Sequence, residues 1–205
     1  MTALRLDDLG QYSDTLHLRS GQRLSVRFVE PRDADTLQAY VRGLSISSRY
    51  RRFLGAAREL PPRLLEDFTH AGEDDRFSVI ATIAVEDVER IVAEARYALN
   101  ADQASVEFGV SVDDQWQGHG IGAALLQNLE CRAAALGARR LFGDALRCNE
   151  VMIALARKTG FALVHSPGDW RLVRFEKQIA WSHDSPCASW RLVAASRQIA
   201  QQAGG

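Results

Sequence analysis

Apolar and polar residues alternate along the first part of the chain in the manner of β-strands. Between residues 14 and 29 the alternation runs on both sides of Ser20-Gly21-Gln22, which is typical of a hairpin with one half-buried face. After Pro31-Arg32-Asp33 the apolar spacing changes to three and four residues over 35–44, which predicts a helix. A second helix is expected over 61–68, because a pair of prolines can open its first turn.

The rest of the chain continues with strands and then alternates strands with helices. The pattern predicts strands over 77–85, 90–98, 104–112, 139–146, 161–165 and 170–178, and helices over 123–136 and 149–159. Strands that come first, followed by strand–helix alternation, favour an α+β fold with a mixed sheet over a doubly wound one.

Composition and charge describe an ordinary globular chain. The sequence has 205 residues, of which 46% are hydrophobic and 25% charged. Its net charge of −1 gives no general attraction to nucleic acid or to an anionic membrane, so neither is expected as a partner. No apolar run approaches the roughly 20 residues of a membrane span, and charged residues interrupt 1–12, so we expect a cytoplasmic protein.

The cysteines give little indication of a structural role. Cys131, Cys148 and Cys187 are odd in number and have no Cys-x-x-Cys spacing. We therefore expect neither a disulfide framework nor a metal site.

The most informative segment is a glycine cluster between a predicted strand and a predicted helix. Glycines at 118, 120 and 122 allow backbone N–H groups to approach an oxyanion, and the helix start adds unpaired donors, so a phosphate or pyrophosphate is the natural ligand. A tight packing turn would show the same spacing. The Gly-Lys-Ser/Thr of a Walker loop is absent, and four or five expected strands precede the cluster, unlike the loop of a dinucleotide-binding unit.

Two segments together resemble a known family. Gln117-Gly118-His119-Gly120-Ile121-Gly122 resembles motif A of the GNAT acetyltransferase superfamily, and the strand 106–112 before it resembles that fold's fourth strand. The segment 149–161, from Asn149 to Gly160-Phe161, is similar to the family's second motif. The resemblance implies a GNAT fold, with a central, mostly antiparallel sheet of six to seven strands, about four flanking helices, and a splay between the fourth and fifth strands.

Further features resemble the bacterial Pat-like protein lysine acetyltransferases. They are the hairpin that runs into Pro31-Arg32-Asp33-Ala34, the segment 47–53, and Glu107-Phe108-Gly109-Val110 followed by Trp116. The acetyltransferase domain is expected over 14–179, with an N-terminal extension over 1–13 and a tail over 180–205. The tail is expected to be a packing or oligomer appendage with a short helix, and a homodimer is plausible.

The resemblance also implies roles for individual residues. The acetyl donor is acetyl-CoA, and Glu107 occupies the position of the Pat-like general base, although a strand carboxylate is also explained by solvation or an ion pair. Main-chain groups around Val110 and Val112 would bind pantetheine, and those of 117–122 the pyrophosphate. Asn149 is equally explained as a helix N-cap, and Lys158, with Arg157, as plain helix surface. The implied cofactor-binding residues are Val110, Ser111, Val112, Gln117, Gly118, His119, Gly120, Ile121, Gly122, Ala123, Asn149 and Lys158.

One departure from the family pattern keeps several functions open. Many members place a tyrosine at the position of Ala156 to protonate the leaving thiolate, and Tyr50, Tyr97 and the histidines are candidate replacements. The leading hypothesis is direct transfer to a protein lysine in a ternary complex. The alternatives are transfer to a small amine, such as a polyamine, an amino acid or an aminoglycoside, and a non-catalytic acyl-CoA sensor. The segment 49–52 either steers an acidic substrate or, as we favour, is a solvated turn.

Overall fold

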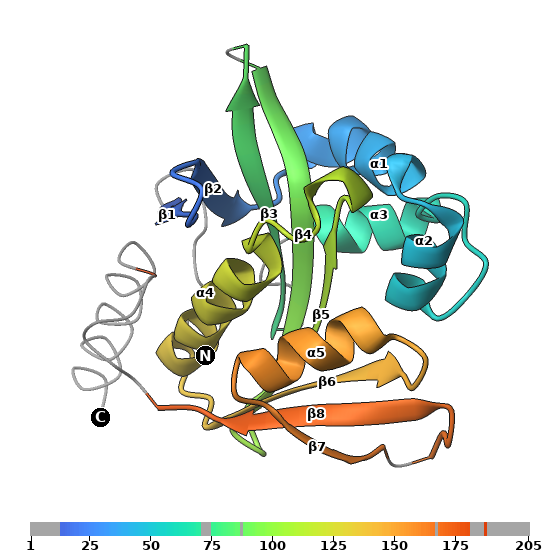
Figure 1. The fold of residues 1–205 in the computed structure, drawn as a ribbon, viewed down its shortest axis with the longest axis vertical. Helices are drawn as coiled ribbons and strands as arrows, with labels where there is room; N and C mark the ends of the chain where they lie inside the picture. The colour runs from blue at the N-terminus through green and yellow to red at the C-terminus, as the bar shows by residue number, and fades with distance from the viewer. Residues whose placement is uncertain (1–12, 71–74, 87, 167, 181–186, 188–205) are drawn as a thin grey trace.

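The computed structural model describes residues 13–70, 75–86, 88–166, 168–180 and 187. They form an eight-stranded sheet in the order β1-β2-β3-β4-β5-β6-β8-β7 (Figure 1). Its strands are β1 Asp14–His17, β2 Arg23–Phe28, β3 Arg76–Val85, β4 Val88–Asn100, β5 Ser105–Val112, β6 Arg140–Leu146, β7 Ala162–His165 and β8 Leu172–Gln178. The α-helices are α1 Ala34–Gly43, α2 Ile46–Phe53, α3 Pro62–Thr69, α4 Ile121–Ala135 and α5 Glu150–Lys158, with 3₁₀ turns η2 Pro31–Asp33 and η4 Asp114–Trp116.

The sheet confirms the predicted α+β class. Every neighbouring pair of strands is antiparallel except β5 and β6, which are parallel. The described residues hold eight strands and five α-helices, so the expected six to seven strands and about four helices were too few. The expected short helix of the tail lies outside the described residues.

Helix α2 was not predicted, because its residues carry little apolar pattern. It has no buried residue, and its sequence Ile46-Ser-Ser-Arg-Tyr-Arg-Arg-Phe53 is mostly polar. Polar contacts fix it instead. The Ser45 hydroxyl caps the helix by accepting from the Ser48 N–H, and Asp114 accepts from the Ser45 N–H and from both hydroxyls. The chain between the predicted helices is therefore a third helix and not a turn.

The two faces of the sheet are covered by different helices (Figure 1). Val79 and Ala81 of β3 belong to the cluster that includes α4 and α5, whereas Ile80 between them belongs to the cluster of α1 and α3. The period of two in a strand sends successive side chains to opposite faces. The strands in the middle of the sheet are therefore apolar on both sides, as their nearly unbroken hydrophobic sequences require.

Strands β5 and β6 are paired at one end only. Their ladder joins Ser105, Val106 and Glu107 to Arg140, Leu141 and Phe142, although both strands continue well past these pairs. Gly143 permits the last close approach, since an added Cβ would lie 2.7 Å from the Phe108 carbonyl oxygen. These two strands take the places of the fourth and fifth strands in the fold that the resemblance implies, so the expected splay is found here.

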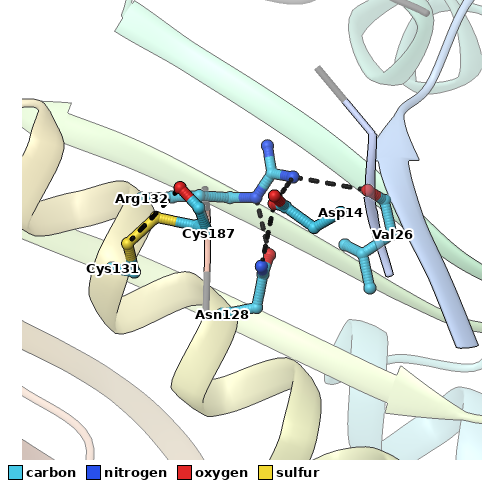
Figure 2. Close-up of a disulfide and its surroundings, with 6 residues drawn as sticks. All are labelled: Asp14, Val26, Asn128, Cys131, Arg132 and Cys187. Atoms are coloured by element: carbon cyan, nitrogen blue, oxygen red, sulfur yellow. Dashed lines mark hydrogen bonds and ion pairs between the residues drawn. A yellow bond between two sulfur atoms is a disulfide. The ribbon is translucent and has the colours of Figure 1, made fainter. Parts of the chain in front are cut away.

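Helix α4 is fixed to the first hairpin by a buried ion pair beside a disulfide (Figure 2). Arg132 donates to Asp14 over 2.7 Å and to Asn128 over 2.6 Å, with both charged side chains almost fully buried. Cys131 is bonded to Cys187, so the expectation of no disulfide was wrong. Cysteine count and spacing do not determine which cysteines lie close together in the fold. Cys148 is free and exposed.

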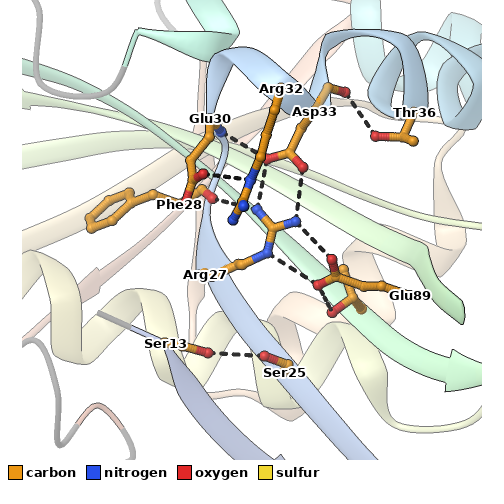
Figure 3. A network of polar contacts seen from close by, with 10 residues as sticks. Ser13, Ser25, Arg27, Phe28, Glu30, Arg32, Asp33, Thr36 and Glu89 are labelled. Atoms are coloured by element: carbon orange, nitrogen blue, oxygen red, sulfur yellow. Dashed lines mark hydrogen bonds and ion pairs between the residues drawn. The ribbon is translucent and has the colours of Figure 1, made fainter. Parts of the chain in front are cut away.

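A second polar network joins β2 to the start of α1 (Figure 3). The Arg27 guanidinium donates to both carboxylate oxygens of Asp33, over 2.7 and 2.8 Å, and also to Glu89 of β4. Burial of Asp33 opposes its ionisation, but the hydrogen bonds from Arg27 and from the Glu30 N–H outweigh burial and lower its pKa. The ion pair between Asp33 and Arg27 therefore holds the predicted turn Pro31-Arg32-Asp33 against β2.

None of the helices in the described part of the chain is both long and apolar enough to cross a membrane.

We predict that Asp33→Asn lowers the free energy of unfolding at neutral pH and that this deficit shrinks in acid. Because the pKa of Asp33 is depressed in the folded state, its stabilisation is complete above the unfolded pKa of about 3.9 and is lost as pH falls through the folded value. Urea unfolding of both proteins between pH 7 and pH 3 measures the difference. The exposed Asp35→Asn is the matched control, and a deficit independent of pH would contradict the account.

Candidate active site

A cavity of about 780 Å³ opens where β5 and β6 separate. Its walls include β4, β5 and β6, the C-terminal end of α2, the first turns of α4 and α5, and part of α3. The cavity therefore reaches both faces of the sheet, the face covered by α1–α3 and the face covered by α4 and α5. A ligand that enters from one side can meet a ligand that enters from the other.

The open edge of β5 supplies unpaired main-chain groups to this cavity. The Asp113 N–H donates to Val92 of β4, and the hydrogen-bonding direction alternates along an antiparallel strand. The main-chain groups of Val110 and Val112 therefore point away from β4, toward the gap. The Val112 carbonyl accepts from the Gln117 side chain, which agrees with this direction.

The glycine loop supplies N–H donors at the other end of the cavity. Gly118 and Gly120 have φ of +80° and +87°, which glycine adopts without strain, and Gly120 is the residue before α4. Among the described residues, no protein group accepts from the N–H groups of 118–123. A row of free donors at a helix N-terminus binds phosphate oxygens, so this loop fits the diphosphate of a coenzyme A thioester.

The structure brings most of the predicted cofactor residues to the cavity, but not all in the expected way. Val110, Ser111, Val112, Gln117, Gly118, Gly120, Ile121, Gly122, Ala123, Asn149 and Lys158 line it. His119 is exposed and does not line it, and its Nδ1 lies 3.0 Å from the Gln117 carbonyl oxygen. Asn149 caps α5 by accepting from the Met152 N–H, so its side-chain oxygen already has a partner.

Glu107 lies at the last paired position before β5 and β6 separate. It stands opposite Phe142 of β6 and Ala98 of β4, and its exposed side chain lines the cavity. On β6, Asp144 accepts two hydrogen bonds from Arg174, over 3.1 and 2.6 Å. Asp144 is the main partner of Arg174, and the nearby charge of Glu107 also helps to raise the pKa of Arg174. The structure shows no hydrogen bond from a described residue to the Glu107 carboxylate.

Sequence reasoning missed a buried polar network that forms one wall of the cavity. Arg52 of α2 forms a bidentate ion pair with Glu94 of β4, whose side chain is 1% exposed. Ser111 donates to Glu94 over 2.8 Å, and the Tyr40 hydroxyl lies 2.9 Å from Ser111. The expectation that 49–52 is a solvated turn was thus wrong for Arg52, and the Ser111 side chain is bound to protein groups.

Charge keeps this network together. Burial opposes the charge on Arg52, but Glu94 more than offsets it and raises the pKa of Arg52. Burial and the nearby Glu94 charge raise the pKa of Tyr40, so its hydroxyl stays protonated. Two sequence features could have revealed the network. One is Glu94 itself, a charged residue in the apolar middle of β4, and the other is the glycine at position 109 of β5. The structure explains this glycine, because an added Cβ would lie 2.5 Å from Arg52 Nη1.

Ala156 is fully buried in the core and does not line the cavity. No tyrosine acid is therefore available at this position. Of the tyrosines proposed as replacements, Tyr97 lines the cavity and Tyr50 does not.

Comparisons with known proteins agree with this geometry. Residues 46–161 match the model of the Acetyltransferase (GNAT) family. An acetyltransferase of Pseudomonas aeruginosa is 26% identical over 152 residues, which covers 74% of this chain and 82% of that protein.

Solved structures show the same likeness. The GNAT domain of S. lividans PAT is 28% identical with a TM-score of 0.76, and the match covers 83% of this chain and 98% of that one. A cAMP-binding acyltransferase from Mycobacterium smegmatis is 22% identical with a TM-score of 0.59 and supports the fold alone; the match covers 92% of this chain and 55% of that one.

The family model spans more than half of the chain, and the open edge of β5 and the glycine loop fit the coenzyme A thioester that this family uses. This chain belongs to the GNAT acetyltransferase family and is an acyltransferase with acetyl-CoA as its acetyl donor.

Proposed function

We propose that this enzyme acetylates the side-chain amine of protein lysines, in a manner similar to the Pat-like acetyltransferases. The observation that carries the proposal is the place of Glu107, an exposed carboxylate in the cavity at the point where β5 separates from β6. The likeness to the GNAT domain of S. lividans PAT supports the same acceptor class. The cavity has lining residues from both sides of the sheet, so an acceptor amine can approach the donor from the side opposite to it.

Transfer requires a neutral amine, because a free lysine with a pKa of about 10.4 is almost wholly protonated at neutral pH. Glu107 takes the proton from the ammonium group, directly or through a water molecule. The nitrogen lone pair then attacks the thioester carbonyl, the new C–N bond forms, and the C–S bond breaks. Both substrates are bound at once, so no acetyl group is carried by the protein.

Main-chain groups orient the donor in this proposal. The Val110 N–H, directed into the gap between β5 and β6, donates to the thioester carbonyl oxygen and stabilises the charge that develops on it. The free N–H groups of 118–123 hold the diphosphate, and Lys158 is placed to meet a phosphate near the end of α5. With Ala156 at the usual tyrosine position, the thiolate leaves with the help of water.

We predict that an acceptor screen separates the two substrate classes. Lysine-containing peptides should be acetylated on Nζ, whereas a polyamine, a free amino acid and an aminoglycoside should give at most background release of the coenzyme A thiol. Thiol release measures the rate, and mass spectrometry of the product identifies the nitrogen. Efficient acetylation of a small amine, with none of the peptides, would replace the protein-lysine assignment with the small-amine alternative.

Replacing the base tests the mechanism. Glu107→Gln should leave the Kd for acetyl-CoA unchanged and lower kcat at pH 7.5 by about 100-fold, because the carboxylate acts only on the amine proton. The deficit should narrow toward pH 10, where more of the lysine is neutral. Glu86→Gln, in the exposed turn after β3, is the matched control and should behave as the wild type. An unchanged kcat for Glu107→Gln would remove Glu107 from the mechanism.

Replacing a loop glycine tests donor binding. Gly120→Ala should raise the Kd for acetyl-CoA about tenfold, since alanine disfavours the φ of +87° that directs the loop N–H groups. Gly21→Ala is closely matched, with φ of +84° in a turn far from the cavity and, as at Gly120, open space around the added Cβ. Both variants should lose about 1 kcal/mol of stability by chemical denaturation. Equal Kd values in isothermal titration would show that the loop does not hold the donor.

A further inference from the structure

Four arginines line the side of the cavity that faces α2 and α3. One is Arg51 of α2, and the other three, which we call the arginine cluster, are Arg52 of α2, Arg76 of β3 and Arg96 of β4. All three line the same cavity as Glu107. The glycine loop and the start of α5 lie at another part of the cavity wall, so the arginine cluster is separate from the residues assigned to the donor diphosphate.

The register of the sheet fixes how the cluster lies relative to Glu107. Arg76, Ala98 and Glu107 stand directly opposite one another on β3, β4 and β5, and their side chains share one face. Two strand spacings of about 4.8 Å separate the outer pair, which puts their Cα atoms about 10 Å apart. Ala98 fills little of the space between them. Arg96 is in the next row on β4, two residues from Ala98 and on the same face.

The members of the cluster differ in how well their charges are neutralised. Arg52 is satisfied by the buried Glu94. Arg96 has one ion pair with a described residue, Asp67, at a long 3.5 Å, while its guanidinium stacks on the Phe68 ring with 4.9 Å to the centroid. Arg76 is exposed and makes no ion pair with any part of the chain that the structure describes.

The surroundings of Arg96 indicate a local excess of positive charge. Burial lowers its pKa, Asp67 offsets part of this effect, and the neighbouring charges of Arg76 and Arg52 lower the pKa further. An anion placed between Arg76 and Arg96 would relieve this repulsion. A planar guanidinium that is held in place by an aromatic ring is well suited to pair with a carboxylate.

We infer that the acceptor carries a carboxylate beside its amine, and that Arg76 and Arg96 bind this carboxylate while the amine lies at Glu107. The inference rests on the proposed function and narrows it to lysines flanked by acidic residues. A carboxylate near the lysine can come from an acidic side chain or from the peptide's C-terminus, and the chemistry at the arginines is the same. The test below distinguishes these two sources.

The substrates for the test are four synthetic pentapeptides with one central lysine and acetylated N-termini. The first has alanine flanks and an amidated C-terminus, the second has aspartate flanks, the third has arginine flanks, and the fourth has alanine flanks with a free C-terminal carboxylate. We expect kcat/KM for the aspartate-flanked peptide to exceed that for the alanine-flanked peptide about tenfold at low salt, and the preference to weaken in 0.5 M salt. A gain for the fourth peptide alone would identify the main-chain carboxylate as the source.

Variants then assign the preference to the cluster. Arg76→Gln and Arg96→Gln should each reduce the aspartate-to-alanine ratio about threefold or more, and Arg76→Glu should favour the arginine-flanked peptide. Arg76 is exposed, so its variants test the charge without disturbing the packing of Arg96 on Phe68. Arg23→Gln, which removes an exposed charge on β2 toward the other end of the sheet, is the matched control and should keep the wild-type ratio.

The outcomes separate this inference from the function it rests on. Equal kcat/KM for all four peptides in the wild type, or an unchanged ratio in both glutamine variants, would overturn the role of the arginine cluster while leaving lysine acetylation in place. A preference for the arginine-flanked peptide in the wild type would also overturn it. If no peptide is acetylated while a small amine is, the proposed function and this inference fail together.

Discussion

The structure depends on the separation of β5 from β6 beyond Glu107. A continuous sheet would pair the outward-facing main-chain groups of Val110 and Val112 with a neighbouring strand, and nothing would remain for a ligand. Because the ladder stops after three pairs, no strand pairs with these groups, although the Val112 carbonyl accepts from the Gln117 side chain. In the proposed function, the amides of the donor would reach this edge of β5. The same gap connects the two faces of the sheet, so donor and acceptor can meet inside it.

An open gap in a sheet needs support from elsewhere, and here buried and partly buried charges provide it. Arg52 ties α2 to β4 through Glu94, and Asp114 ties the start of α2 to the segment that leads into the glycine loop. Helix α2 has no fully buried residue, and Phe53 at its end is only partly buried against the cluster of α1 and α3, so polar contacts contribute much to where the helix lies. Breaking such a contact on one side leaves an unpaired charge, which makes the arrangement specific as well as stable.

The sequence predicted the regular parts of the fold well and the polar ones poorly. Strands such as β3 and helices such as α4 follow from apolar periodicity, and the glycine loop follows from its position between them. Helix α2 has almost no apolar pattern, and the bond between Cys131 and Cys187 joins residues 56 positions apart, so neither could be found by local reasoning. The partners of Arg52 and Glu94 likewise depend on which strands are neighbours. The place of Glu107 at the cavity came from a resemblance and not from periodicity.

The distribution of charge, and not its sum, determines what the enzyme can bind. The chain is almost neutral, with 25 basic and 26 acidic residues, so it has no long-range attraction for anions. Within the cavity, however, the glycine-loop N–H groups and Lys158 are placed at one part of the wall and Arg76 and Arg96 at another. Glu107 lies between these regions on β5, where a carboxylate can receive a proton from a cationic amine. In the proposed function, these positive groups meet the ligand inside the cavity, and recognition of the acceptor would depend on the register of β3, β4 and β5, which sets Arg76 and Arg96 relative to Glu107.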